Sequence, residues 1–175
     1  PLTAYSSLQI PLILLACIAL FIFLFNRRSP DRTITSVAVS VFGIVYIAWF
    51  FSYLMKLHLL PDGSSWVFYT VLIVKAGDAG AYFVGKKFGK VKLLEHVSPN
   101  KSVEGAIGQM VTTVLLSLLF RFFFNVPLIH LAILGLAVGF LALLGDLAES
   151  LIKRDAGVKD SGVIPGTGGI LDLLD

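Results

Sequence analysis

Acidic and basic side chains gather in residues 145–175, directly after an apolar run long enough to cross a membrane. If a helix continues past Gly145, then Asp146, Glu149, Ser150 and Lys153 lie on one face, because residues three, four and seven apart are neighbours on a helix. Carboxylates can hold a divalent metal, and an ammonium group can hold phosphate. The start of this segment therefore predicts a charged binding face at the membrane surface.

The rest of the segment adds a glycine cluster and a second acidic pair. The backbone at Gly166, Gly168 and Gly169 can approach a phosphate closely and donate N–H groups to it. Asp172 and Asp175 are three residues apart and could chelate one ion together. Mg²⁺ suits carboxylates and substrate phosphates, whereas one cysteine and three scattered histidines argue against zinc. The alternative is a solvated, salt-bridged helix followed by an ordinary glycine loop.

Two further groups of residues lie upstream. Lys75 and Asp78 share a helix face inside an apolar segment, where ionisable residues are either functional or paired with each other. The sequence leaves these two interpretations equally open. Ser102 suits a helix N-cap, and a phosphate beside Lys101 would meet both that lysine and the helix N-terminus. Beside a membrane, these groups together predict chemistry on a phosphorylated lipid.

The composition predicts an integral membrane protein, whose helices would position these residues. Hydrophobic residues make up 57% of the chain and charged residues only 14%, with a mean hydropathy of +0.88. A soluble domain carries much more charge. Five apolar blocks approach the roughly 20 residues that a spanning helix needs: Leu8–Phe25, Thr33–Leu54, Trp66–Gly85, Ala106–Phe124 and Leu128–Gly145. We expect an all-α, polytopic integral membrane protein with five spans, a cytoplasmic interfacial helix and a Gly-rich loop.

The distribution of lysine and arginine predicts the orientation. If each block crosses once, most of the 14 basic residues fall on one side, which the positive-inside rule places in the cytoplasm. The net charge of +3 therefore reflects topology, and no nucleic-acid partner is expected. We divide the chain into residues 1–64, two helices without motifs, and residues 65–175, a catalytic membrane domain. The first residue, Pro1, and the abrupt end at Asp175 suggest a fragment of a longer protein.

Three sequence blocks resemble the phosphatidate cytidylyltransferase (CDP-diacylglycerol synthase) family. They are KAGDAGAYFVGKKFGK (75–90), SPNKSVEG (98–105) and GDLAESLIKRDAGVKDSGVIPGTGGILDLLD (145–175), and their order and spacing fit the family. The last block is the most specific, whereas the first two apolar segments match only in hydrophobicity. Many members have His at Thr167 and Arg at Leu173, so no base or cation is expected at these positions here.

The resemblance implies that CTP reacts with phosphatidic acid of the lipid bilayer at the membrane surface, which gives CDP-diacylglycerol and pyrophosphate. It implies Mg²⁺ as cofactor, with a second, monovalent cation as an option. It also implies a homodimer in the inner (cytoplasmic) membrane, with its active site facing the cytoplasm. Its implied metal ligands are Asp146, Asp172 and Asp175, and its implied catalytic residues are Lys153, Arg154, Lys159 and Asp160, with Asp160 also a reserve ligand. The implied substrate-binding residues are Asp78, Ser98, Lys101, Glu149, Ser150, Gly166, Gly168 and Gly169.

Two alternatives differ in class. One is another CTP-dependent lipid enzyme, either a polyprenol or dolichol kinase or an ether-lipid cytidylyltransferase. The other is an ion-coupled transporter that uses Lys75 and Asp78 as its ion site, although most polar residues here lie at the surface rather than the midplane.

Overall fold

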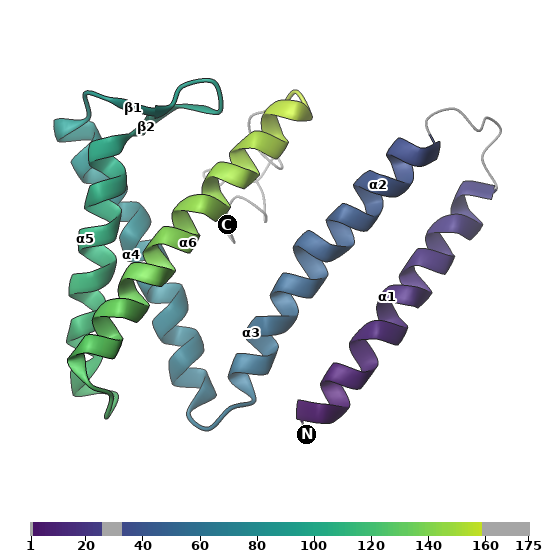
Figure 1. Ribbon diagram of the computed structural model, residues 1–175, viewed down its shortest axis with the longest axis horizontal. Helices are drawn as coiled ribbons and strands as arrows, with labels where there is room; N and C mark the ends of the chain where they lie inside the picture. Colours follow the sequence, from purple (N-terminus) through teal and green to yellow (C-terminus); the bar gives the residue numbers. More distant parts are fainter. Residues whose placement is uncertain (1, 26–32, 159–175) are drawn as a thin grey trace, which may run out of the picture. The chain divides into compact units, whose positions relative to one another are not determined.

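The computed structural model describes residues 2–25 and 33–158, and these residues are helical apart from one short hairpin and the connecting turns (Figure 1). The helices are α1 (Leu2–Phe25), α2 (Thr33–Gly43), α3 (Phe50–His58), α4 (Gly63–Phe88), α5 (Val103–Leu119) and α6 (Leu128–Asp155). A π-helical segment, η1 (Ile44–Trp49), joins α2 to α3, and a 3₁₀ turn, η2 (Phe120–Phe122), extends α5. The predicted all-α, polytopic membrane fold is confirmed.

Four helical segments in the described residues are long and apolar enough to cross a membrane. They are Thr33–His58, Gly63–Phe88, Val103–Phe122 and Leu128–Asp155, and they correspond to the last four predicted blocks. In α1 the described apolar stretch is shorter, Ile10–Phe23. The helices extend beyond the predicted blocks because charged residues continue the helix after the apolar run ends, as Lys86 and Lys87 do in α4. A 26-residue helix is about 39 Å long, more than the roughly 30 Å of hydrocarbon that it must cross.

The chain forms two compact units, Pro1–Val67 and Phe68–Asp175. In the first unit α1 contacts α2, and α2 and α3 bury no residue. Apolar side chains that face outward in this way suit contact with lipid. The second unit contains most of α4, the hairpin, α5 and α6, and it holds the residues that the sequence singles out among those described.

Small residues let α4, α5 and α6 pack closely in the second unit. A methyl group on Gly108 of α5 would lie 2.6 Å from Val84 Cβ of α4, and one on Gly139 of α6 would lie 2.4 Å from Thr113 Oγ1 of α5. Without water to drive association, membrane helices depend on close contact of this kind. The backbones of the three helices can therefore approach one another.

Buried polar groups link the same helices. The Tyr69 hydroxyl of α4 lies 2.7 Å from Ser117 Oγ of α5, and Ser117 donates a hydrogen bond to the Leu131 carbonyl of α6 at 2.5 Å. The Tyr69 ring contacts Phe120 and Phe124 edge to face. Each buried hydroxyl has a partner here, as an apolar interior requires.

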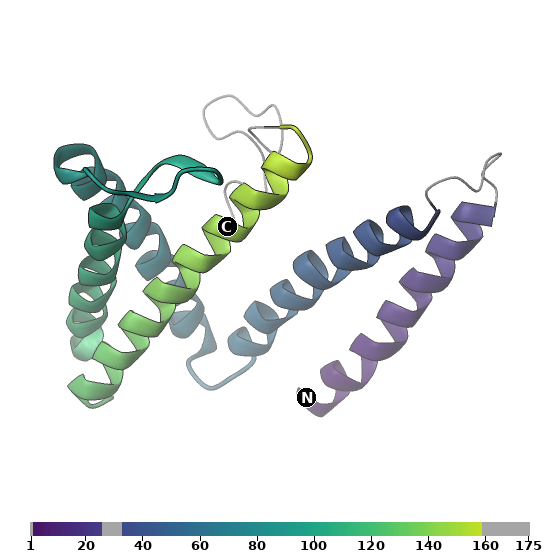
Figure 2. The same cartoon turned by 45° about the horizontal axis from the view of Figure 1, so that its top comes forward.

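An antiparallel hairpin, which the sequence analysis missed, joins α4 to α5. Its strands are β1 (Lys92–Leu94) and β2 (Ser98–Ser102). The predicted N-cap is confirmed, because Ser102 Oγ accepts a hydrogen bond from the Gly105 N–H at 3.1 Å. Figures 1 and 2 both place the hairpin at the end of this unit where α4 ends, α5 begins and α6 ends. We call this the hairpin end.

Candidate functional site: a polar cavity at the hairpin end

A polar cavity of about 470 Å³ lies at the hairpin end of the second unit. Four elements line it, α4, β2, α5 and α6, together with Leu93 of β1. Its polar lining includes Asp78, Lys86, Ser98, Lys101, Gln109 and Asp146. Four of these, Asp78, Ser98, Lys101 and Asp146, are predicted site residues from three separate segments. The fold brings them together, and their roles remain predictions.

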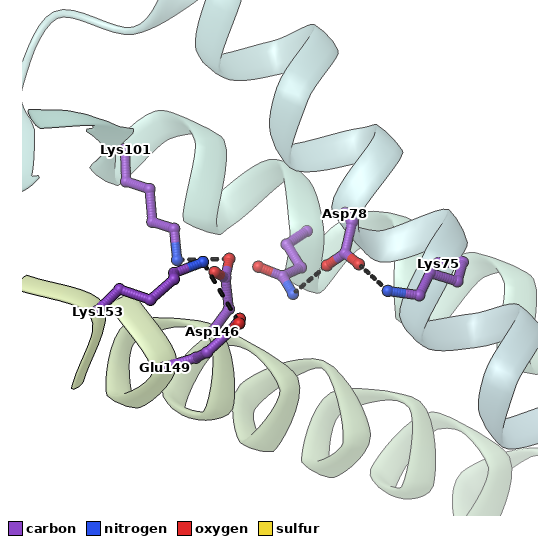
Figure 3. A network of polar contacts seen from close by, with 7 residues as sticks. Lys75, Asp78, Lys101, Asp146, Glu149 and Lys153 are labelled. Atoms are coloured by element: carbon purple, nitrogen blue, oxygen red, sulfur yellow. Dashed lines mark hydrogen bonds and ion pairs between the residues drawn. The ribbon is translucent and has the colours of Figure 1, made fainter. Parts of the chain in front are cut away.

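An ion pair between Lys101 of β2 and Asp146 of α6 lies in this cavity (Figure 3). Asp146 is in place because α6 continues past Gly145 to Asp155, as expected. The side chains of Lys101 and Asp146 are 21% and 34% exposed, so water reaches both only in part. The pair places one cation and one anion where an anionic ligand and a metal ion could each find an opposite charge.

Asp78 contacts Lys75 and Gln109, and the sequence did not predict the contact with Gln109. Lys75 Nζ lies 3.6 Å from its carboxylate, so the predicted intrahelical ion pair is present. Gln109 Nε2 of α5 donates a hydrogen bond to Asp78 Oδ1 at 3.5 Å, and Gln109 is only 2% exposed. The available signal was an amide side chain within a predicted membrane span, because such a group is costly in the membrane unless it has a partner.

The predicted charged face of α6 lies beside the cavity. Glu149 is fully buried, and Lys153 Nζ lies 3.4 Å from its Oε1 atom. In Figure 3 the polar ends of Glu149, Lys153, Lys101 and Asp146 point toward one another. Ser150 follows Glu149 on α6 and is half-buried. Arg154 Nε donates a hydrogen bond to the Val97 carbonyl between the two strands at 3.4 Å, so it holds α6 against the hairpin.

Seven predicted site residues lie outside the described residues. They are Lys159, Asp160, Gly166, Gly168, Gly169, Asp172 and Asp175. Within residues 2–25 and 33–158, no group of three or more His, Cys, Asp or Glu side chains could hold a metal ion. Asp146 is the one predicted metal ligand that the structure describes. Its carboxylate fits Mg²⁺, which takes one or two protein carboxylates and completes its shell with phosphate and water.

The described charges define what the cavity can bind. Lys86 and Lys101 line it, and Lys153 lies beside it, so several cations converge at one end of three membrane helices. Lysine binds phosphate as a compact positive charge, and lysines near the ends of membrane helices lie at headgroup depth. The cavity therefore suits a phosphorylated ligand at the membrane surface.

The chain matches the Cytidylyltransferase family over residues 2–175. It is similar to the phosphatidate cytidylyltransferase of Bacillus subtilis (strain 168), with 40% identity over 147 residues, or 82% of this chain and 55% of the relative. The protein of the same name from Haemophilus influenzae (strain ATCC 51907 / DSM 11121 / KW20 / Rd) is 46% identical over 114 residues, covering 61% and 40%. That from Mycobacterium tuberculosis (strain ATCC 25618 / H37Rv) is 39% identical over 150 residues, covering 84% and 45%. The chain spans about half the length of these curated relatives.

Proposed function

The chain belongs to the Cytidylyltransferase family, and on this premise we propose that it transfers the cytidylyl group of CTP to phosphatidate. The products are CDP-diacylglycerol and pyrophosphate, which places the protein in phospholipid biosynthesis. The observation that carries the proposal is the polar cavity, where Lys101 and Asp146 meet at one end of three membrane helices. The names of the relatives supply the substrates.

The reaction needs charge neutralisation more than a strong base. A phosphate oxygen of phosphatidate attacks the α-phosphorus of CTP and forms a new P–O bond. The bond from the α-phosphorus to the oxygen that bridges to the β-phosphorus breaks, and pyrophosphate leaves with that electron pair. Because both reactants are anions, the protein must bring them together against their repulsion and hold them in line. Lys101, which lines the polar cavity, and Lys153, which lies beside it, would bind their phosphates.

We further propose that Mg²⁺ assists this chemistry. Asp146, Asp172 and Asp175 would hold the ion, with Asp160 in reserve, and a second, monovalent cation would share the site. When bound, the metal would stabilise the charge that develops on the leaving pyrophosphate. Lys159 and Arg154 would bind phosphate oxygens, and the backbone at Gly166, Gly168 and Gly169 would donate N–H groups to them.

The location of the reaction also belongs to the proposal. We place the hairpin end on the cytoplasmic side, where CTP is available, and the three helices in the inner membrane, where phosphatidate resides. We propose a homodimer as the functional form. The transporter alternative lacks comparable support, because Lys75 and Asp78 are paired with each other and the family is one of cytidylyltransferases.

The test is a turnover assay of the full-length protein in lipid nanodiscs with labelled CTP. We expect CDP-diacylglycerol and pyrophosphate to form in equal amounts with phosphatidate, and neither to form with diacylglycerol, which lacks the attacking phosphate. ATP in place of CTP is the nucleotide control. Phosphate transfer from CTP to a polyprenol, or ion flux across vesicles without nucleotide, would contradict the proposal.

A further inference from the structure

A second cavity, wholly apolar, lies between α5 and α6. Its volume is about 580 Å³, and every residue that lines it is apolar. On α5 it is lined by Ala106 and Met110, among others, and on α6 by Leu136, Ala137, Phe140 and Leu143. These positions follow helical spacing on each helix, so each helix presents one continuous face to the cavity. We call this cavity the α5–α6 groove.

The α5–α6 groove adjoins the polar cavity. Ala106 and Leu143 line both cavities, one from each helix. Leu143 lies three residues before Asp146, and therefore one turn away from it on the same helix face. Figures 1 and 2 both show α5 and α6 diverging toward the hairpin end. A single molecule could therefore place a charged group near Lys101 and Asp146 and an apolar group in the groove.

The rim of the groove is exposed and its length matches one leaflet. Ile107, Ile133, Leu136 and Phe140, which all line it, are 58%, 59%, 52% and 53% exposed. Its α6 lining runs from Ile133 to Leu143, about 15 Å along a helix axis at 1.5 Å per residue. The hydrocarbon core of a bilayer is about 30 Å thick, so each leaflet contributes about 15 Å. An acyl chain of a lipid in the leaflet at the hairpin end would have the same extent.

From this geometry we propose that the α5–α6 groove binds one acyl chain of the lipid substrate while the phosphate lies in the polar cavity. This inference rests on the proposed function and adds to it a binding site for the tail. The small side chains of Ala106 and Ala137 leave the space that the chain occupies, and Met110 and Phe140 contact it. The lining of the groove then contributes to acyl-chain preference.

The test compares long-chain with short-chain phosphatidate in Ala137→Phe. Ala137 is exposed, so the larger ring fills the groove rather than the packed helix contact. We expect kcat/KM for dioleoyl phosphatidate to fall roughly tenfold or more, the range that one lost methylene contact costs in an apolar pocket. Turnover of dihexanoyl phosphatidate, whose tails are too short to fill the groove, should change less than twofold. Leu141→Phe is the control, because Leu141 is also on α6, is 64% exposed and lines neither cavity.

Each outcome bears on one proposal. If Ala137→Phe lowers turnover of both lipids equally, or of neither, the groove is not an acyl-chain site. It would then be covered by another protein segment, by a second copy or by bulk lipid. If the unmodified protein converts neither lipid, the proposed function fails instead. A phosphatidate with a photoreactive acyl chain gives a reading that does not depend on the variant. It should crosslink to residues 103–110 and 133–143, and crosslinks confined to other helices would overturn the inference.

Discussion

Lys101 and Asp146 are the residues through which the hairpin and α6 meet. A partly buried ion pair has two possible purposes, to hold the hairpin on α6 or to keep two reactive groups close to their ligands. Either purpose predicts the same geometry, and a single substitution would harm both. The two purposes differ in whether the lysine and the aspartate can exchange positions. Folding needs only the attraction between opposite charges, whereas chemistry needs the cation and the carboxylate each at its own position.

Exchanging the two charges separates these purposes. Lys101→Asp and Asp146→Lys alone should each lower the free energy of unfolding by about 1–3 kcal/mol, since each leaves like charges together in a partly buried site. The double exchange should recover most of that loss. Turnover should nevertheless stay roughly 100-fold or more below the unmodified protein, because the cation and the carboxylate no longer face their own ligands. Thermal unfolding in detergent and CTP-dependent turnover are the two measurements. Recovery of both in the double variant would show that the pair is structural only.

The sequence predicts the candidate residues better than it predicts their partners. Asp78, Lys101 and Asp146 stand out because charges are rare in so apolar a chain. Gln109 is more deeply buried than these three, at 2% exposed, but it carries no charge, so composition does not draw attention to it. The complete burial of Glu149 could not be predicted either. It depends on how α6 packs against the rest of the unit, which helical spacing on α6 alone does not define.

At the scale of elements, the site depends on how closely α5 and α6 pack. Gly139 faces Thr113 so tightly that any side chain at this position must displace it. Gly145, six residues later on α6, has no atom within 4 Å of where a methyl group would be. The two glycines therefore offer the same substitution in a crowded and in an open environment.

We expect Gly139→Ala to lower the free energy of unfolding by about 1–3 kcal/mol, the usual cost of overpacking a close contact. Gly145→Ala should be neutral or stabilising, because alanine favours the helix over glycine by about 1 kcal/mol. Thermal unfolding of both variants in the same detergent measures this difference in stability. Thr113→Ala combined with Gly139→Ala removes the clashing hydroxyl and should recover part of the loss. Equal destabilisation by both glycine substitutions would show that helix packing is not the cause.

The hairpin marks the limit of prediction at this scale. The long apolar blocks that become helices are evident because composition and length suffice to identify them. Strands β1 and β2 contain three and five residues, include Pro99, and show no alternation of apolar and polar side chains. Local sequence cannot identify such strands, because they form where α4 and α5 hold their ends together. The N-cap at Ser102 was predictable because it depends only on adjacent residues.

At the scale of the whole molecule, the second unit has one end rich in lysine and one end with few charges. The hairpin end carries Lys86, Lys87, Lys90 and Lys92, of which Lys86 lines the polar cavity. The opposite end, between α5 and α6, contains Arg121 and Asn125 within a run of phenylalanines. The positive-inside rule assigns the basic end to the cytoplasm, and in the proposed reaction CTP would reach the cavity from the same side. The orientation of the helices in the membrane is therefore linked to the proposed cytidylyl transfer.

Cysteine labelling tests this orientation directly. In a Cys17→Ser background, which removes the single native cysteine, Lys90→Cys and Asn125→Cys place one thiol at each end of the second unit, both at exposed positions. A membrane-impermeant maleimide should label Lys90→Cys in inside-out vesicles and Asn125→Cys in right-side-out vesicles. Detergent should make both accessible, which controls for thiols that are merely buried. The reverse pattern would place the polar cavity outside the cell, away from CTP, and a cytidylyl transfer there would have no nucleotide to use.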